Sequence, residues 1–173
     1  MPTTRPTRDD AVDYYFTYIN KVGDGDIRVL LREQLVDTLN FLGGIDTARS
    51  LERYEADKWS IREVVSHLND TERVFVGRAF WFARGFDSEM PGMDQDVAVA
   101  HSNADNRDWI GHIDEFRAIR ESTLAFFDNL TPEAWERRGI ASGNPFTVRG
   151  LAYICAGHVT HHCDVIRTRY LKV

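Results

Sequence analysis

The sequence predicts an all-α protein folded as a four-helix bundle. Four long segments carry apolar residues at steps of three and four, which is the spacing of one helix face, and no segment alternates apolar and polar residues as a half-buried strand does. The 173 residues are 43% hydrophobic and include ten Phe and four Trp, which is enough for one core. We therefore expect a single domain over residues 10–173, preceded by a poorly ordered polar tail over residues 1–9.

The first two long helices are recognised by their ends. An aromatic-rich segment over residues 11–22 precedes the first helix, which we predict over residues 26–42 and which two glycines end. The second helix is predicted from Ser60 to Gly85. Ser60 and Glu63 form a capping box, in which the serine side chain accepts a free backbone N–H and the glutamate reaches back to the serine N–H.

The last two long helices are predicted over residues 107–130 and from Thr147 to Leu171. Between them we expect one short helical turn over residues 132–137, opened by a Thr-Pro pair, and then a loop over residues 138–146.

The connection over residues 85–106 lacks helical periodicity and is much longer than a hairpin between neighbouring antiparallel helices requires. It therefore predicts one parallel crossover, between the second and third long helices. Met90 and Met93 suit adaptable apolar contacts, so this connection could form a wall or lid over a binding pocket.

Charge and composition exclude several classes of partner. The formal net charge is −6, from 21 Lys and Arg against 27 Asp and Glu, and an acidic protein is not attracted to nucleic acid or to an anionic membrane surface. No segment resembles a signal peptide or a transmembrane helix, so we expect a cytoplasmic protein. Cys155 and Cys163 lie eight residues apart in one predicted helix, too far apart in space for a disulfide.

Three of the six histidines point to a metal site. His158 and His162 lie one turn apart on the apolar stripe of the last helix, and His67 lies inward on the second helix. Burying polar rings is costly unless they are partnered, and bundle proteins assemble metal sites from such side chains. The predicted cofactor is one divalent transition metal, with zinc, nickel and iron as candidates, because imidazole suits each of them. No fourth ligand is evident, which predicts open coordination positions for water or substrate.

Alternatives to this assignment remain at the sequence level. His161 competes with His162, because a spacing of three also places two rings on one face, and the whole pattern could consist of structural histidines. We expect His101 and His112 to be solvated. Cys155 fits a small core residue, with a minor alternative as a ligand or redox group.

Asp70 is the candidate catalytic carboxylate. It follows His67 by three residues on the same helical side, where it could accept a proton or orient a bound water. The alternative is a solvated surface carboxylate. Glu63 is a weaker candidate, because the capping box already occupies it.

Two segments resemble the DinB/YfiT-like family of metalloenzymes. They are residues 57–72 (DKWSIREVVSHLNDTE) and residues 157–162 (GHVTHH), and the likeness extends from about Tyr14 to Leu171. The resemblance implies a bundle of up-down-down-up order, a homodimer, and metal ligands that correspond here to His67, His158 and His162.

The resemblance also implies an activity. Relatives include S-transferases that use bacillithiol or mycothiol and mycothiol-dependent isomerases, so we predict a metal-dependent transfer of a small-molecule thiol to a small electrophile. The alternatives are a hydrolase that uses a metal-bound water on a hydrolysable substrate, and a non-catalytic metal-binding stress protein. After the second motif many relatives have Arg-Gly-Gln where this chain has Cys163-Asp164-Val165, so the substrate is not fixed by the resemblance.

Overall fold

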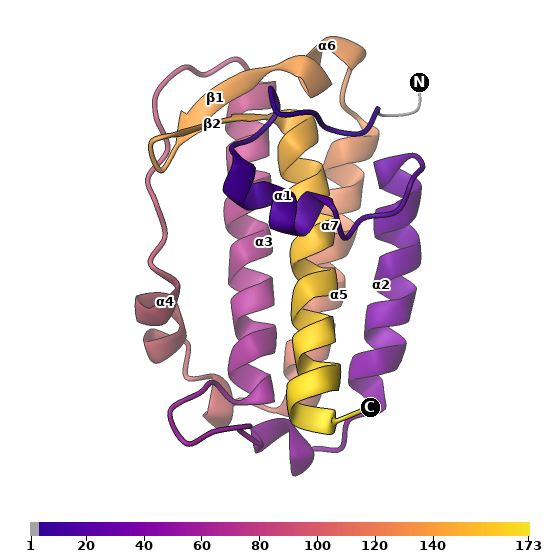
Figure 1. Cartoon of the computed structure of the whole chain (residues 1–173), viewed down its shortest axis with the longest axis vertical. Coiled ribbons are helices and arrows are strands. Elements are labelled where there is room, and N and C mark those ends of the chain that lie inside the picture. The colour runs from indigo at the N-terminus through magenta and orange to yellow at the C-terminus, as the bar shows by residue number, and fades with distance from the viewer. Residues whose placement is uncertain (1–3) are drawn as a thin grey trace.

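The computed structural model describes residues 4–173 and confirms the predicted four-helix bundle (Figure 1). Its long helices are α2 (Ile27–Gly43), α3 (Ile61–Ala83), α5 (Trp109–Asp128) and α7 (Val148–Val165), the last extended by the π-helical η4 (Ile166–Leu171). Helix α3 packs against both α7 and α5, and α5 packs against α2. The most extensive contact between two helices is that of α3 with α7, which carry the predicted metal ligands.

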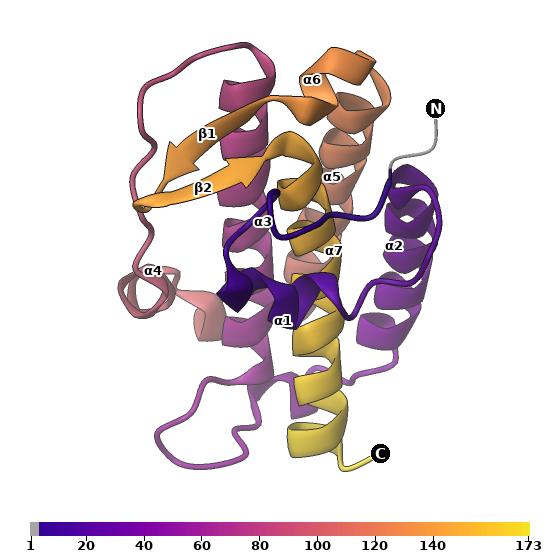
Figure 2. The ribbon, with the colours of Figure 1, turned by 45° about the horizontal axis from the view of Figure 1, so that its top comes forward.

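The order of the helices is up-down-down-up. Figures 1 and 2 show that α3 and α5 run in the same direction, while α2 and α7 run in the opposite direction. The connection between α3 and α5 consequently returns along the whole bundle, as the sequence predicted. It contains two short helices that its sequence pattern did not reveal, α4 (Gln95–His101) and η3 (Ala104–Asn106). Helix α4 has only two turns, too few for a periodicity to stand out.

Short elements lie across the bundle and at both of its ends (Figure 1). The turn η1 (Asp13–Tyr15) and helix α1 (Phe16–Ile19) lie across α7, and η2 (Arg49–Leu51) precedes α3. The short helix α6 (Pro132–Glu136) confirms the predicted turn.

The loop predicted over residues 138–146 is wrong, because this segment forms an antiparallel hairpin of β1 (Arg138–Ala141) and β2 (Asn144–Thr147). Ser142 and Gly143 both have positive φ, of 52° and 71°, which allows a tight two-residue turn. The strands are four residues each and show no strict alternation of buried and exposed side chains, so their sequence gives little strand signal.

The predicted helix starts are confirmed by their caps. Ser60 Oγ accepts the Glu63 N–H at 3.1 Å, and Glu63 Oε2 accepts the Ser60 N–H at 2.8 Å. Thr147 Oγ1 accepts the Gly150 N–H at 3.0 Å at the start of α7. These bonds fix where α3 and α7 begin, and hence which side chains each helix turns toward the other.

A buried ion pair joins three helices in the core. Arg120 of α5 is fully buried and donates through Nε and Nη2 to the two Glu72 oxygens of α3, each at 2.7 Å. Arg120 Nη1 also donates to Gln34 Oε1 of α2 at 2.8 Å, and Thr123 donates to Glu72 at 2.8 Å. Every charged atom of the pair thus has a partner, which is the condition for burying it.

Helix α1 crosses α7 in direct backbone contact at Gly157. A Cβ atom placed on Gly157 would lie 2.1 Å from the carbonyl oxygen of Tyr18, far inside van der Waals distance. Only glycine allows this approach. The crossing places the Tyr18 ring beside His158, the next residue of α7, with the ring centroids 5.2 Å apart.

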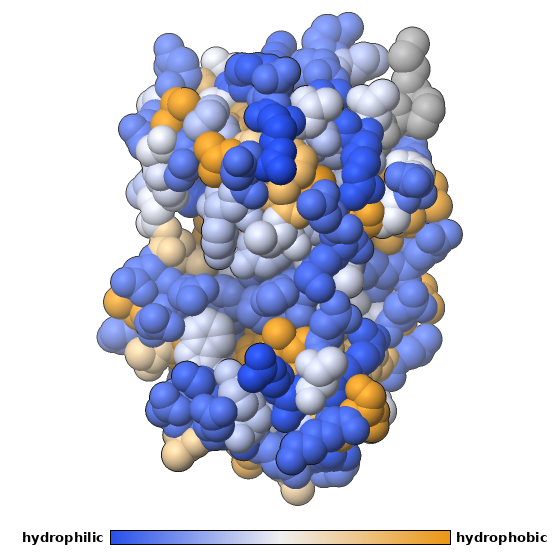
Figure 3. Space-filling view, viewed as in Figure 1, coloured by the Kyte–Doolittle hydropathy of each residue, from blue (hydrophilic) through white to orange (hydrophobic). Residues whose placement is uncertain are grey.

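The segment before η1 is attached to the domain. Of the predicted tail, residues 1–3 lie outside the described residues. In the described part, Arg5 donates to the carbonyl oxygens of Val22 at 2.8 Å and Ile19 at 3.1 Å. Within residues 4–173 no helix combines the length and the hydropathy needed to cross a membrane. Figure 3 shows a mostly hydrophilic face on which hydrophobic residues form small scattered patches.

Candidate metal centre

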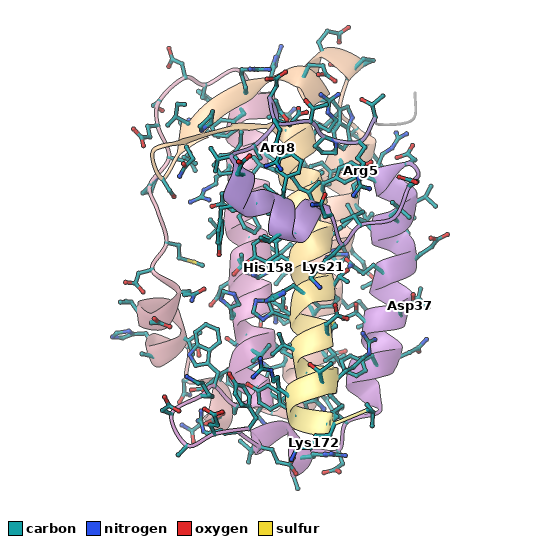
Figure 4. All side chains as sticks on the ribbon, in the orientation of Figure 1. Arg5, Arg8, Lys21, Asp37, His158 and Lys172 are labelled. Atoms are coloured by element: carbon teal, nitrogen blue, oxygen red, sulfur yellow. The ribbon has the colours of Figure 1, made fainter. Side chains whose placement is uncertain are left out.

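The three histidines predicted as ligands meet between α3 and α7. Nε2 of His158 lies 3.1 Å from Nε2 of His67 and 3.2 Å from Nε2 of His162, and the ligand nitrogens all lie within 4.8 Å of one another. Figure 4 shows the labelled His158 near the middle of the bundle, below α1. The close packing of α3 on α7 thus brings together side chains 91 residues apart in the chain.

These nitrogens fit a single metal ion. Two nitrogens bound at about 2.0–2.1 Å to a tetrahedral ion lie about 3.3 Å apart, close to the distances observed here. A neutral imidazole nitrogen carries either one proton or one lone pair in the ring plane, so Nε2 of His158 cannot form good hydrogen bonds to both neighbours. An ion that accepts three lone pairs satisfies all three rings at once.

The surroundings keep the rings neutral. His67 and His158 are buried and His162 is half-buried. Burial lowers the pKa of His67 to about 4. Burial, with added repulsion from His67 and His161, lowers the pKa of His162 to about 3, and the pKa of His158 is held well below its usual value by burial and the neighbouring histidines. Neutral rings are the form that binds metal.

Aromatic rings and a threonine orient the ligands. The Trp59 ring lies 5.0 Å from that of His67, and the Phe75 ring lies 5.9 Å from that of His158. Thr71 Oγ1 donates to the His67 carbonyl oxygen at 2.6 Å and lies 3.3 Å from His67 Nδ1. Such contacts fix the ring that presents Nε2.

The other histidines are not part of the group of nitrogens that could hold one ion. His161 is half-buried, and its ring packs on Tyr18, with centroids 5.5 Å apart, and on His162, at 5.0 Å. His101 is exposed at the end of α4. The expectation that His112 is solvated is wrong, because the crossing connection folds over it: it is fully buried and its Nε2–H donates to the Ala104 carbonyl at 3.0 Å.

Both cysteines are free, as their spacing predicted, and both are buried. Burial raises the pKa of the Cys155 thiol, with Glu72 acting in the same direction. Cys155 lies in the main hydrophobic core cluster and is not part of the group of nitrogens that could hold a metal.

Asp70 lies on the side of α3 that faces α5. Its carboxylate accepts from Arg73 at 3.3 Å, and Arg73 donates to Glu115 of α5 at 2.6 Å. Burial raises the pKa of Asp70, an effect that Arg73 opposes. The structure does not bring Asp70 to the three histidines, and its catalytic role stays a prediction. Glu63 is engaged by its cap and by Arg53 at 2.5 Å.

Two cavities reach the histidines. The first, which we call the tyrosine cavity, has a volume of about 240 Å³ and touches His67 and His158. It is lined by the rings of η1 and α1 and by polar groups from α3 and the hairpin, among them Tyr14, Tyr15, Tyr18, Arg78 and Ser142.

The second, which we call the tryptophan cavity, has a volume of about 310 Å³ and touches His162. Its walls include Tyr54, Lys58, Trp59 and Tyr170. Gln95 of α4 lines both cavities. The crossing connection is therefore a wall of the site, through Gln95 and Met93, whereas Met90 pairs with the hairpin at Ala141.

The sequence did not identify the lining residues of the tyrosine cavity. Arg78 follows His67 by eleven residues, which is three helical turns, so its place on the same face of α3 could have been inferred. The tyrosines belong to the aromatic-rich segment 11–22, but nothing in that segment indicates that it crosses α7.

Comparisons with known proteins agree with this fold. YfiT from Bacillus subtilis, described as a probable metal-dependent hydrolase with an unusual four-helix bundle topology, matches with a TM-score of 0.69 and 16% sequence identity over 98% of this chain and 90% of its own. A mycothiol-dependent maleylpyruvate isomerase matches with a TM-score of 0.68 and 13% identity over 80% of this chain and 58% of its own. No curated protein sequence matches the chain. The family model of the DinB superfamily matches residues 30–166, and the chain therefore belongs to the DinB superfamily.

Proposed function

We propose that this protein is a metal-dependent enzyme that transfers a low-molecular-weight thiol to a small electrophile. The observation that carries the proposal is the pair of cavities at one three-histidine centre. A transfer between two molecules requires two binding sites beside the same reacting group, whereas hydrolysis requires only one organic substrate. The tyrosine cavity touches His67 and His158 and the tryptophan cavity touches His162, which supports two binding sites beside one centre.

The histidines supply a metal centre with room for substrate. His67, His158 and His162 would hold the ion with three neutral nitrogens, and three protein ligands are the number typical of catalytic rather than structural sites. A divalent ion held there would act as a Lewis acid and would lower the pKa of a thiol bound beside the rings.

The residues of the tyrosine cavity favour a thiol as the nucleophile on that side. Among the described residues that line it there is no Asp or Glu, so this cavity offers no carboxylate as a general base for water, whereas Asp57 and Asp96 line the tryptophan cavity. A thiol whose pKa is lowered loses its proton to solvent without such a base. Its sulfur then forms a bond to the electrophilic carbon, and the leaving group departs with the electrons of the broken bond.

Hydrolysis is the second candidate. It is supported by the fold shared with YfiT, which is described as a probable metal-dependent hydrolase, just as the shared fold of a mycothiol-dependent isomerase supports thiol chemistry. Both reactions would use the same open position, and the thiol requirement separates them.

The test begins with protein purified without a histidine tag, because a tag binds metal by itself. The protein is loaded with zinc, nickel or ferrous iron and mixed with chlorodinitrobenzene and either bacillithiol, mycothiol or glutathione. We expect conjugation that requires metal and thiol, is lost in His158→Ala, and persists in the matched control His101→Ala. Metal-dependent hydrolysis of nitrophenyl esters without any thiol, and no conjugation, would instead establish the hydrolase.

A further inference from the structure

Arg78 is a buried cation without an acidic partner. Arg78 is only 4% exposed. Its Nη2 donates to the Pro91 carbonyl at 2.9 Å and to Ser142 Oγ at 2.8 Å, and both acceptors are neutral. Within residues 4–173 no carboxylate lies within ion-pair distance of this guanidinium, in contrast to the equally buried Arg120, which is paired with Glu72. A buried charge that lacks an opposite charge is costly, so such an arginine points to a missing anion.

The missing anion has a place to bind. Arg78 lines the tyrosine cavity, in which it is the sole charged side chain among the described lining residues apart from the neutral histidines. The rings of Tyr14, Tyr15 and Tyr18 also line this cavity. A guanidinium in such a partly enclosed site binds an anion more strongly than one in open solvent.

The distance from Arg78 to the histidines sets the size of the ligand. Its Cζ lies 6.0 Å from the Phe75 ring centroid, which lies 5.9 Å from the His158 centroid, so the guanidinium and the imidazole are at most about 12 Å apart. A ligand of a few bonds can therefore reach both the metal position and Arg78.

We propose that Arg78 binds the carboxylate of a thiol substrate whose sulfur lies at the three-histidine centre, which makes this protein selective for anionic thiols. This inference rests on the proposed thiol transfer. Arginine offers two parallel N–H donors that match a carboxylate, and the described residues that line the cavity include no carboxylate to compete for them. The net charge of the chain is −6, so selection of an anion must come from this local charge and not from the protein as a whole.

The experiment uses ligands that differ only in this charge. Protein loaded with cobalt is titrated with straight-chain mercaptocarboxylates, from mercaptoacetate to mercaptooctanoate, and with the corresponding neutral amides, and sulfur binding is followed by the cobalt absorption spectrum. We expect one chain length of the acid to bind about tenfold to one hundredfold more tightly than its amide, the range for a charge-assisted hydrogen-bonded pair. The best chain length reports the distance between the metal and Arg78.

Two variants of Arg78 and one control assign the effect. Arg78→Gln should abolish the preference for the acid over the amide, and Arg78→Lys should retain part of it. The control is Arg84→Gln, which removes an exposed arginine of the same helix region and should behave as wild type. Equal affinity of acid and amide in the wild type, or a preference that survives in Arg78→Gln, would overturn the proposal.

A second measurement separates this inference from the thiol-transfer proposal. The same acids with a methylated sulfur are titrated by calorimetry, because they test the anion site without a thiol. Binding that depends on Arg78 supports the anion site even if no thiol perturbs the cobalt spectrum, in which case only the thiol transfer fails. Absence of acid-dependent binding in both titrations rejects the anion site.

Discussion

Gly157→Ala tests whether the contact between α1 and α7 positions the tyrosine cavity. The new methyl group would lie 2.1 Å from the Tyr18 carbonyl oxygen and 2.4 Å from its carbon, so α1 must move by more than 1 Å to reach an ordinary contact. The clash involves backbone, which cannot rotate away as a flexible side chain can. The ring of Tyr18 lies on His158 and lines the cavity, and the movement therefore changes the shape of the cavity.

The expected magnitude combines two opposing effects. Overpacking a close contact costs about 1–3 kcal/mol. Replacing glycine by alanine within a helix gains up to about 1 kcal/mol. We therefore expect a net loss of about 1–2 kcal/mol in the free energy of unfolding, which corresponds to a decrease of roughly 2–8 °C in the Tm of a chain of this length.

The matched control is Gly77→Ala in α3, where the new methyl group meets nothing within 4 Å. It should gain stability, by about 0.5–1 kcal/mol. Thermal unfolding followed by circular dichroism measures the stability of both variants. Elemental analysis measures their metal content, and calorimetry with the best mercaptocarboxylate measures the affinity of the cavity for the thiol. Gly157→Ala should keep stoichiometric metal, because all ligands are on α3 and α7, but bind the thiol more weakly. If Gly157→Ala is as stable as Gly77→Ala and binds the thiol as wild type does, the contact does not position the cavity.

Four further predictions follow from the site and the core. Alanine at any one of the candidate ligands, His67, His158 and His162, should abolish stoichiometric metal measured by elemental analysis, whereas alanine at His101, His112 or His161 should not. Arg120→Met leaves Glu72 buried without its charge partner and should cost about 3–5 kcal/mol in urea unfolding, whereas adding Glu72→Leu to it should recover most of the loss. In metal-free protein the pKa of His67 is about 4, below its ordinary 6.5, so the unfolded state takes up protons first as the pH is lowered. The free energy of unfolding should therefore fall between pH 6.5 and pH 4, by up to about 1.4 kcal/mol per pH unit for each such group. Urea unfolding at several pH values measures this, and a flat profile would contradict it. Asp70→Asn should bind metal normally, and unchanged turnover in the conjugation assay would end its candidacy as a catalytic residue.

The sequence was informative where local rules and long periodicities act together. Ser60 and Glu63 form a capping box, which depends only on residues close together in the sequence. His158 and His162 are four residues apart, a spacing that places two side chains on one face of any α-helix. The sequence placed Asp70 on the same side of α3 as His67. A side chain three residues further along a helix points about 60° away from the first, which is enough for Asp70 to face α5 while His67 faces α7.

The remaining features depend on contacts between distant segments. His112 is buried by the crossing connection, and no property of its own helix indicates that cover. Arg78 is recognisable as a binding residue only after Ser142 and Pro91 have been placed beside it. The roles of His112 and Arg78 are recognisable only in the folded chain, because their contacts come from other elements than their own helices.

The 91 residues between His67 and His158 affect when the metal can enter the protein. A chain emerging from the ribosome has completed α2 and α3 long before α7 exists, so during most of its synthesis it presents one isolated imidazole, which cannot hold an ion by itself. The last turns of α7 to be made bring two imidazoles, His158 and His162, on one helix, but all three rings come together only when α7 packs on α3. A bound ion would therefore stabilise that late contact rather than any structure formed earlier in synthesis.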